Sequence, residues 1–420
     1  LFLYKIPLFK MQLKYIITPP KSVQTTIQLP ASKSISNRAL ILNALSLSTA
    51  PIKNLSDCED TQVIIDAFNS NTNQFDIKAA GTAMRFLTAF LAGMDGNWII
   101  GGSKRMHERP IHPLVETLIA LGADIEYIEK DGYPPLNIKG KKLKGGEVYL
   151  SGNISSQFIS ALLMVGPIME NGLIIHIENE IVSKPYIQLT IGLMAKYGVK
   201  VNWEGNTISV KQQKYKPVEI TVESDWSAAS YWYEIASLIP GSEITLKGLT
   251  KESLQGDSNV VNLFTDMGVT TEFESDGIII RSIKKRTKKF FHNFVNEPDL
   301  VQTFAAACCF KNTHFLFSGI QSLKIKETDR VQAMINEFKK LGYVLKENEI
   351  GMLEWDGERC EPVVNPSIDT YDDHRMAMSF TPGAIALGSI NINDPHVVSK
   401  SYPQFWNDLK HAGFKIEERR

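Results

Sequence analysis

The 420-residue sequence has few cysteines, and their spacing indicates neither a metal site nor a disulfide framework. None of the four, Cys58, Cys308, Cys309 and Cys360, forms a Cys-x-x-Cys pair or lies near a histidine at the spacing of a zinc site. Cys308 and Cys309 follow three alanines, in a segment that predicts a buried helix. Reduced thiols, as in a cytoplasmic protein, are the simplest interpretation.

The sequence also lacks a charge excess and long apolar runs. Its 45 Lys and Arg and 46 Asp and Glu give a net charge of -1, so no overall field favours nucleic acid or a membrane surface. Any anion site must therefore come from local clusters of cations. No apolar run approaches the roughly 20 residues that span a bilayer. Residues 1–10 are apolar but short and have no small-residue cleavage site, so we interpret them as an N-terminal extension and expect the first strand at 12–17.

One pattern recurs along the chain: an amphipathic helix ends in a hydrophobic residue and a glycine, and a short strand follows. Glycine suits the left-handed residue that ends a helix because it has no Cβ to clash. The copies, 70 to 76 residues apart, end at Gly122, Gly198, Gly268, Gly342 and Gly413, and a degenerate sixth copy would end at Asn69. Helix-Gly-strand is common in α/β proteins, but this regular spacing favours five or six repeated units, and hence two domains of three units each.

Three motifs in the first third of the chain place cations beside polar backbone. Ser32 can cap a helix that begins at Lys33, with Ser34 and Arg38 along one face of its first turns. The alternative is an ordinary capped helix with exposed charges. Gly81-Thr82 opens another apolar helix, where glycine allows close approach of a ligand. Arg109 precedes Pro110 and is therefore expected in extended structure just before a helix.

The later motifs combine hydroxyls, carboxylates and further cations. The hydroxyl and amide groups of Ser155-Ser156-Gln157 and of Ser183 to Tyr186 could hydrogen-bond a polyol and its phosphate. Alternatively, Ser155 could simply cap a helix. The sequence predicts a helix that begins with Lys326, Glu327 and Arg330 and runs to Lys340. A glutamate in the first turn also interacts favourably with the helix dipole, which is the structural alternative to a role in the site. His374 follows two aspartates, but ligands at successive positions cannot easily face one metal ion. The remaining candidates are Asp299, Arg375 and Lys400.

Together these motifs resemble the 5-enolpyruvylshikimate-3-phosphate synthase family, in family order over residues 12–416. The resemblance is carried by Ser32 to Arg38, Ala80 to Arg85, Arg105 to Pro110, Ser155 to Gln157, Ser183 to Tyr186, Lys326 to Arg330, Asp373 to Met378, and Lys400. It implies the two-domain α/β enolpyruvyl transferase fold, in which each domain is built from three βαβαββ repeats. By this resemblance one domain comprises residues 11–31 and 226–420 and the other 32–225, with the active site in the cleft between them.

The resemblance also implies the reaction and its residues. The family transfers the enolpyruvyl group of phosphoenolpyruvate to the 5-hydroxyl of shikimate 3-phosphate by addition and elimination, releasing phosphate, in aromatic amino acid biosynthesis. Asp299 matches the family's proton acceptor and Glu327 its proton donor, with Lys33 beside them. The shikimate 3-phosphate site would contain Lys33, Ser34, Arg38, Ser155, Ser156, Gln157, Ser183, Tyr186, Asp299, Ser322 and Lys326. The phosphoenolpyruvate site would contain Lys33, Gly81, Arg109, Gln157, Arg330, Arg375 and Lys400.

The sequence departs from the family pattern at a few positions and leaves two alternatives to weigh. Ala79, Phe86 and Ser322 stand where the family usually has Asn, Pro and Asn, which affects the fine shape of the pocket. A sister enzyme that acts on a UDP-sugar commonly has a reactive cysteine in a loop, for which only Cys58 is suitably placed. A non-catalytic anion-binding protein would be expected to lose Asp299, Glu327 or Lys33. We expect a cytoplasmic monomer that needs no cofactor or metal and binds no nucleic acid or membrane.

Overall fold

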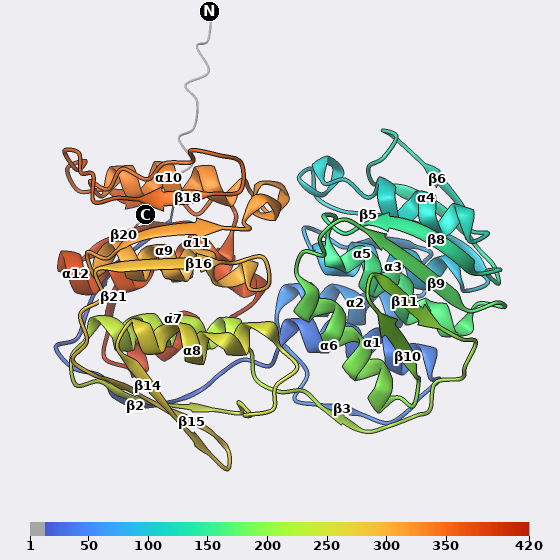
Figure 1. The fold of residues 1–420 in the computed structure, drawn as a ribbon, viewed down its shortest axis with the longest axis horizontal. Helices are drawn as coiled ribbons and strands as arrows, with labels where there is room; N and C mark the ends of the chain where they lie inside the picture. Colours follow the sequence, from blue (N-terminus) through green and yellow to red (C-terminus); the bar gives the residue numbers. More distant parts are fainter. Residues whose placement is uncertain (1–12, 420) are drawn as a thin grey trace, which may run out of the picture.

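The computed structural model describes residues 13–419 and arranges them as two lobes that lie side by side (Figure 1). Each lobe has its own hydrophobic core. The core of the first lobe takes its residues from 17–29 and 226–414, and the core of the second lobe from 31–222. The extension expected at residues 1–10 lies outside the described residues. Within residues 13–419, no helix has the length and apolar character needed to cross a membrane.

Three mixed sheets form the first lobe. Their strand orders are β19-β20-β1-β21, β14-β15-β13-β2 and β16-β17-β18. The strands are β1 (Lys14–Thr18), β2 (Gln24–Gln28), β13 (Glu243–Lys247), β14 (Val269–Glu274), β15 (Gly277–Ser282), β16 (Lys289–Asn293), β17 (His314–Ser318), β18 (Leu353–Trp355), β19 (Ser367–Ile368), β20 (Ile390–Asn393) and β21 (Lys415–Arg419). Each sheet contains one parallel pair, namely β19 with β20, β2 with β13, and β16 with β17, and antiparallel strands complete it.

The second lobe repeats this arrangement. Its sheets have the orders β4-β5-β7-β6, β10-β11-β9-β8 and β12-β3. The strands are β3 (Ile52–Lys53), β4 (Gln74–Asp76), β5 (Gly96–Gly101), β6 (Asp124–Tyr127), β7 (Leu136–Gly140), β8 (Gly146–Ser151), β9 (Leu173–Glu178), β10 (Val201–Glu204), β11 (Thr207–Val210) and β12 (Ile220–Thr221). Again each sheet holds one parallel pair: β4 with β5, β8 with β9, and β3 with β12. In the two four-stranded sheets a helix connects the parallel strands and an antiparallel hairpin completes the sheet, which is the expected βαβαββ unit.

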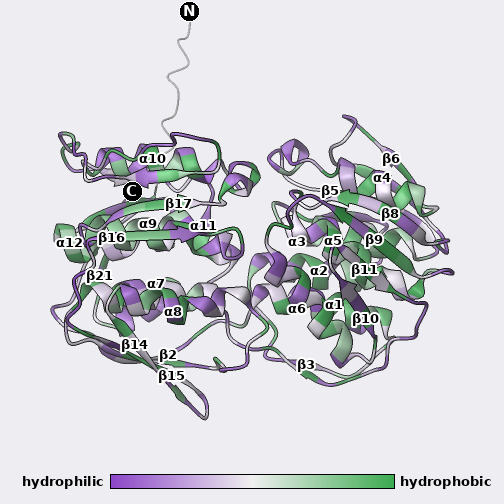
Figure 2. Ribbon diagram, viewed as in Figure 1, coloured by the Kyte–Doolittle hydropathy of each residue, from purple (hydrophilic) through white to green (hydrophobic). Residues whose placement is uncertain are grey.

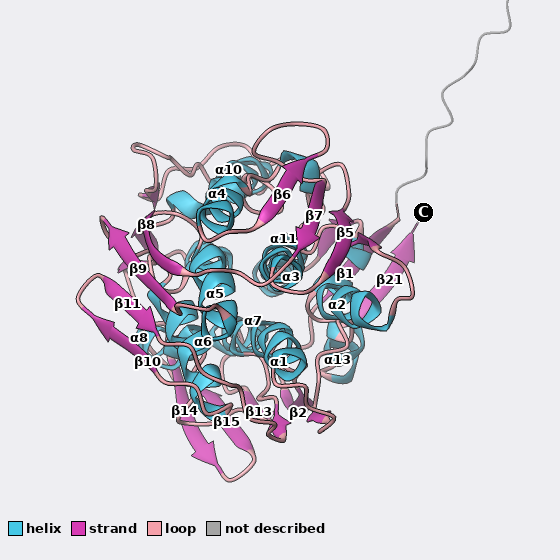
Figure 3. Ribbon diagram, turned by 90° about the vertical axis from the view of Figure 1, so that its right-hand side faces the viewer, coloured by secondary structure: helices cyan, strands magenta, loops and turns pink. Residues whose placement is uncertain are grey.

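The sheets of each lobe surround a set of inner helices (Figure 3). The helices are α1 (Lys33–Leu45), α2 (Glu59–Asn69), α3 (Gly81–Ala92), α4 (His112–Ala120), α5 (Ser156–Val165), α6 (Lys184–Lys196), α7 (Trp226–Leu238), α8 (Val260–Asp266), α9 (Val301–Phe310), α10 (Arg330–Lys340), α11 (His374–Phe380), α12 (Ala384–Leu387) and α13 (Phe405–His411). All residues of α9 and α11 are buried, and α5 is apolar along most of its length (Figure 2). A helix that is apolar on every side must lie inside a core. Cys308 and Cys309 are buried in α9, as predicted.

The repeat predicted from the glycines is confirmed at its five regular copies. All five glycines have positive φ, from +81° at Gly198 to +104° at Gly122, and each follows the end of a helix. The prediction for the sixth copy is wrong. Asn69 is the last residue of α2 and does not have positive φ, because the chain leaves this helix through an extended Ser70 instead.

Two chain segments connect the lobes and pair with each other. Ala31 and Ser224 form an antiparallel bridge, and the N–H of Asp225 donates to the carbonyl of Pro30 at 2.9 Å. The Asp225 carboxylate then accepts the N–H of Ala228 in α7 at 3.0 Å and the N–H of Lys33 in α1 at 3.3 Å. One side chain thus caps a helix in each lobe, which fixes where α1 begins beside the first lobe.

Candidate active site

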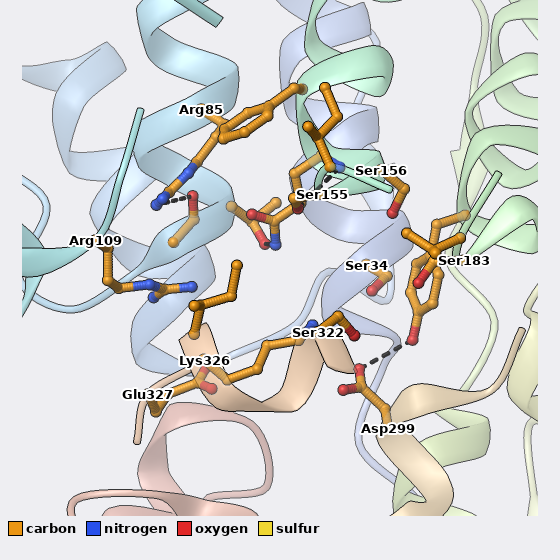
Figure 4. Close-up of a pocket in the computed structure, with 18 of the residues that line it drawn as sticks. Ser34, Arg85, Arg109, Ser155, Ser156, Ser183, Asp299, Ser322, Lys326 and Glu327 are labelled. Carbon is orange, nitrogen blue, oxygen red and sulfur yellow. Dashed lines mark hydrogen bonds between the residues drawn. The ribbon is translucent and has the colours of Figure 1, made fainter. Parts of the chain in front are cut away.

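A cavity of about 270 Å³ lies between the lobes and is lined by side chains from both (Figure 4). The second lobe contributes Lys33, Ser34, Arg38, Asp60, Gly81, Thr82, Arg85, Arg109, Pro110, Pro113, Asn153, Ile154, Ser155, Ser156, Gln157, Phe158, Val182, Ser183 and Tyr186. The first lobe contributes Asp299, Ser322, Ile325, Lys326, Glu327, Arg330, His374 and Arg375. Except for Lys400, the structure brings every residue predicted for the site to this one cavity.

Several helices point their N-termini at the cavity. Lys33, Gly81, Ser156 and Arg330 are the first residues of α1, α3, α5 and α10, and all four line it. The first N–H groups of a helix have no partner within the helix, and the helix dipole adds partial positive charge there. Convergence of several such ends favours anionic ligands.

The side chains of the cavity reinforce this preference. Seven cationic side chains, those of Lys33, Arg38, Arg85, Arg109, Lys326, Arg330 and Arg375, face only three carboxylates, those of Asp60, Asp299 and Glu327. With His374 neutral, an excess of four positive charges remains in a site largely shielded from water. Such charges act more strongly than at an exposed surface, so the cavity suits a ligand or ligands with several negative charges.

Arg38 is held rigidly although no carboxylate pairs with it. Its guanidinium donates to Thr190 Oγ1 at 2.7 Å, to the carbonyl of Ser34 at 2.9 Å and to Ser160 Oγ at 3.3 Å, and it lies 5.1 Å from the centre of the Phe86 ring. Burial lowers the pKa of Arg38 to about 10. A preoriented cation without a counter-ion within residues 13–419 is suited to bind an anion directly.

Arg109 and Arg85 form a second cationic group around the start of α3. Arg109 donates to the carbonyl of Ala79 at 3.3 Å, and Arg85 donates to the carbonyls of Gly81 at 3.3 Å and Pro110 at 2.9 Å. A Cβ atom on Gly81 would lie 2.5 Å from Arg109 Nη2, so only glycine allows the guanidinium to lie over the helix start. Burial, and then the charge of Arg109, lower the pKa of Arg85.

On the opposite side, Arg330 joins three carboxylates. Its guanidinium is 3.1 Å from Asp299 Oδ1, 2.8 Å from Glu327 Oε2 and 2.7 Å from Asp373 Oδ2. Arg375 lies 2.9 Å from the other oxygen of Asp299. Arg330 is only 2 % exposed, so these ion pairs are shielded from water.

These pairs control the ionisation of the two candidate acid–base groups. Burial alone would raise the pKa of Asp299, but Arg375, Lys326 and Arg330 outweigh it and hold this pKa below its usual range. Burial is likewise outweighed at Glu327, where Arg330 and Arg109 hold the pKa well below its usual range. Both groups are therefore ionised at neutral pH.

Direct contacts across the cavity join the two lobes. Tyr186 Oη donates to Asp299 Oδ2 at 2.9 Å, and the N–H of Ser183 donates to the carbonyl of Val295 at 2.8 Å. Arg105 donates to the carbonyls of Lys326 at 3.2 Å and Glu327 at 3.1 Å. Since these bonds link groups on opposite walls, the structure shows the lobes closed on each other.

One local prediction needs correction, and one predicted residue lies apart from the cavity. Lys326 and Glu327 do not begin α10, which starts at Arg330, because the carboxylate of Asp329 accepts the N–H of Gln332 at 3.0 Å and caps the helix there. The helix does run to Lys340, as predicted. Lys400 does not line the cavity, because its ammonium lies 2.6 Å from Asp372 Oδ1 and also donates to the carbonyl of Asp372.

Sequence reasoning assigned no site role to five polar side chains that line the cavity: Asp60, Thr82, Arg85, Asn153 and His374. Thr82 and Arg85 belong to the Gly-Thr motif itself, so their position in the first turn of α3 could have indicated them. Thr82 accepts from Gln157 at 3.2 Å. His374 is buried, and neither ring nitrogen has a hydrogen-bond partner in the part of the chain that the structure describes. Burial, Lys33 and Arg375 lower its pKa well below the usual value. It therefore presents a neutral imidazole to the cavity.

The unusual residues of this chain leave the cavity intact. Ala79 supplies its backbone carbonyl to Arg109, and that contact needs no side chain at position 79. Phe86 is buried beneath Arg38. Ser322 lines the cavity from the short helix Gln321–Ile325. Cys58, the cysteine that the sequence placed in a plausible loop, is fully buried before α2, with its sulfur 3.4 Å from Thr61 Oγ1.

Comparisons with known proteins agree on one family. The family model of EPSP synthase (3-phosphoshikimate 1-carboxyvinyltransferase) matches residues 17–70 and 65–409. A 3-phosphoshikimate 1-carboxyvinyltransferase of Bacteroides fragilis is 52% identical over 406 residues, covering 96% of this chain and 99% of the relative. Another, from Aliivibrio fischeri, is 37% identical and covers 94% and 98%. The solved structure of an EPSP synthase from Acinetobacter baumannii matches with a TM-score of 0.79 at 23% identity, over 97% of this chain and 100% of that chain.

Proposed function

The chain belongs to the EPSP synthase family, the 3-phosphoshikimate 1-carboxyvinyltransferases, and we propose how its cleft carries out that reaction. The reaction transfers the enolpyruvyl group of phosphoenolpyruvate to shikimate 3-phosphate, in the shikimate pathway of aromatic amino acid biosynthesis. The two substrates bring two phosphates and two carboxylates together, groups that repel each other in water. The observation that supports this cavity as the active site is its excess of cations at converging helix N-termini.

Shikimate 3-phosphate is assigned to the side of the cavity that carries hydroxyls and amides. Arg38, which has no carboxylate partner among residues 13–419, is available for an anionic group of this substrate. The proposed contacts are those of Lys33, Ser34, Arg38, Ser155, Ser156, Gln157, Ser183, Tyr186, Asp299, Ser322 and Lys326. Ser183 has a left-handed backbone with φ of +56°, a strained conformation for a residue other than glycine, and such strain often occurs at ligand sites.

Phosphoenolpyruvate is assigned to the neighbouring group of cations. Its proposed contacts are Lys33, Gly81, Arg109, Gln157, Arg330 and Arg375, and Lys400 would join them only after releasing Asp372. Guanidinium groups bind carboxylate and phosphate oxygens in pairs, which fixes the orientation of the ligand as well as its charge.

We assign the acid–base roles to Asp299 and Glu327. Asp299 accepts the proton of the 5-hydroxyl as its oxygen attacks C2 of phosphoenolpyruvate, and Glu327, assisted by Lys33, delivers a proton to C3. The proton on C3 is then removed and the C–O bond to phosphate breaks, which forms the enol ether. Positioned acid–base groups of this kind contribute roughly 10²- to 10⁴-fold each.

Binding of phosphoenolpyruvate would also prepare these two groups for catalysis. Arg330 pairs with Asp299 and Glu327, and Arg375 pairs with Asp299. When the anionic groups of the substrate engage the same arginines, the carboxylates lose part of the charge that lowers their pKa. Asp299 then becomes a stronger base, and Glu327 can take up the proton that it must donate.

The two hydrophobic cores suggest the domain boundaries. We propose one domain of residues 11–31 and 226–420 and another of 32–225, which move relative to each other about the paired segments at 30–32 and 223–225. We also propose that the protein works as a cytoplasmic monomer. The four cysteines have no disulfide partner within the described residues, and three of them are buried, in keeping with a reducing compartment.

The test of this function is a phosphate-release assay with purified protein, phosphoenolpyruvate and shikimate 3-phosphate. Phosphate should appear only when both substrates are present, together with an equal amount of the enol ether. Replacing shikimate 3-phosphate with a UDP-sugar should give none. Release with the UDP-sugar alone would identify the sister activity, and binding without release would indicate a non-catalytic anion-binding protein.

Replacing Gly81 with alanine should weaken phosphoenolpyruvate binding selectively. The new methyl group would lie 2.5 Å from Arg109 Nη2 and force the guanidinium away. Losing hydrogen bonds from this charged group costs about 1.5–3 kcal/mol of binding free energy, so KM for phosphoenolpyruvate should rise roughly 10- to 100-fold. Steady-state kinetics should show a much smaller change in KM for shikimate 3-phosphate. An equal rise in both KM values would contradict the assignment of Gly81 and Arg109 to one substrate.

Replacing Arg105 with alanine tests whether lobe closure depends on its two bonds to the opposite wall. Because these bonds form only in the closed state, their loss should raise KM for both substrates, each by about 5- to 10-fold for a net bond energy near 1 kcal/mol. The neighbouring variant Lys104→Ala, at an exposed position, serves as the control. Wild-type KM values in the Arg105 variant would show that closure does not depend on it.

A further inference from the structure

Asp60 lines the cavity from α2, a helix that supplies no other residue to it within the described part of the chain. Its Oδ2 atom lies 2.9 Å from Lys33 Nζ, and only 12% of its side chain and 15% of that of Lys33 are exposed. A pair this close and this shielded is held far more firmly than a surface ion pair.

The start of α2 is fixed to α1 by buried hydrogen bonds. The N–H of Ser56 donates to Ser36 Oγ at 3.0 Å, and Thr61 Oγ1 donates to Asn37 Oδ1 at 2.8 Å. Ser36, Asn37 and Thr61 are fully buried. Asp60 directly precedes Thr61, so these bonds orient its carboxylate toward the first residue of α1.

Asp60 is one of several charged or titratable groups that face Lys33. Glu327 also attracts the ammonium across the cavity, and Arg375 repels it. The groups that face Lys33 are Asp60 in α2, Cys58 before it, Glu327 before α10, Arg375 and His374 in α11, and Asp225 before α7. Without Asp60, the ammonium would be drawn toward Glu327, whose carboxylate is assigned to proton transfer.

We propose that Asp60 is a positioning residue, which holds the ammonium of Lys33 in place for phosphoenolpyruvate and away from Glu327. Asp60 itself need not touch the reacting atoms. This inference rests on the proposed contact between Lys33 and phosphoenolpyruvate.

A pH profile can distinguish this role from a merely structural one. Burial alone would lower the pKa of Lys33, but Asp60, with Cys58 and Glu327, outweighs it, so the pKa is raised. Lys33 is therefore fully charged in the wild type at every pH used for assay. If the charge of Asp60 is removed, the pKa of Lys33 falls. The decline of activity on the alkaline side of the pH profile should then begin at a lower pH than in the wild type.

The main variant is Asp60→Asn, which keeps the size of the side chain but removes its charge. We expect kcat/KM for phosphoenolpyruvate to fall at least about 30-fold, the low end for losing one charge of a buried pair, and the alkaline limb to move to lower pH. Asp60→Glu keeps the charge and should retain the wild-type position of this limb. Glu59→Gln, at the exposed neighbouring residue of the same helical turn, should behave as wild type.

A double-variant cycle with Lys33→Met completes the test. If Asp60 acts through Lys33, Asp60→Asn should add less than about threefold to the loss caused by Lys33→Met. If the losses in kcat/KM caused by the two substitutions multiply in the double variant, as they do for independent residues, the proposal is overturned. An alkaline limb that is not shifted in Asp60→Asn would overturn it as well. Phosphate release by the wild type with both substrates tests the proposed function separately. The positioning role of Asp60 can therefore fail while the proposed function holds.

Discussion

Replacing Asp299 with alanine is expected to lower kcat by about 10²- to 10⁴-fold while both substrates still bind, because the change removes the base that takes the proton of the 5-hydroxyl. Arg330 and Arg375 lose a competing carboxylate in this variant and remain free to bind phosphoenolpyruvate. Dissociation constants from calorimetry should therefore stay close to wild type for phosphoenolpyruvate, while phosphate release nearly stops. Asp299→Asn should show the same loss, since an amide cannot accept the proton.

The control for this experiment is Asp276→Ala, at an exposed aspartate of the same lobe that pairs with Lys247 on the surface. It should leave both kcat and binding unchanged. Wild-type turnover in Asp299→Ala would remove Asp299 from the mechanism. Loss of phosphoenolpyruvate binding instead of turnover would show that the carboxylate orients the arginines rather than accepting a proton.

Local sequence rules predicted the repeated fold because single residues indicate where each helix ends. A glycine that follows a helix reports a left-handed backbone, which few other residues adopt without strain. The positive φ of Gly122, Gly198 and Gly268 therefore followed from the sequence. Asn69 shows the limit of this rule, since asparagine tolerates the left-handed conformation but does not require it, and here the helix ends in extended structure.

The composition of the cavity was predictable for the same reason. Serine caps, Gly-Thr and paired cations at helix starts are local patterns, and Ser32 does cap α1 by accepting the N–H of Ile35. Nothing local, however, indicates which helix ends face one another. That the motifs share one cavity followed from the resemblance to a family rather than from the residues alone.

The features that the sequence did not indicate come from contacts between distant segments. The partner of Lys400 is Asp372, 28 residues away, and no periodicity in the sequence connects them. Asp60 was missed because an acidic residue in the first turn of a helix is fully explained by the helix dipole. Only the position of α2 against α1 turns that residue toward Lys33.

Replacing Arg330 with methionine should destabilise the protein by about 3–5 kcal/mol, the usual cost of removing one partner from buried ion pairs. The variant leaves Asp299, Glu327 and Asp373 close together without the guanidinium that joins them. Urea denaturation at neutral pH should show the loss directly. Arg281→Met provides a matched control, because Arg281 also joins two carboxylates, Glu243 and Glu272, but on the surface, and its replacement should have a far smaller effect.

The stability loss in Arg330→Met should shrink as the pH falls, which distinguishes charge repulsion from a packing defect. In the wild type, the pKa values of Asp299 and Glu327 are below their unfolded values, so these groups stabilise the fold above about pH 4 and lose that contribution in acid. Without Arg330 both pKa values rise, because burial is no longer outweighed to the same degree. The carboxylates of the variant then take up protons at higher pH than those of the wild type, which relieves their repulsion. The difference in unfolding free energy should therefore decrease as the pH is lowered toward about pH 4 and below, whereas a difference that is constant with pH would attribute the loss to packing alone.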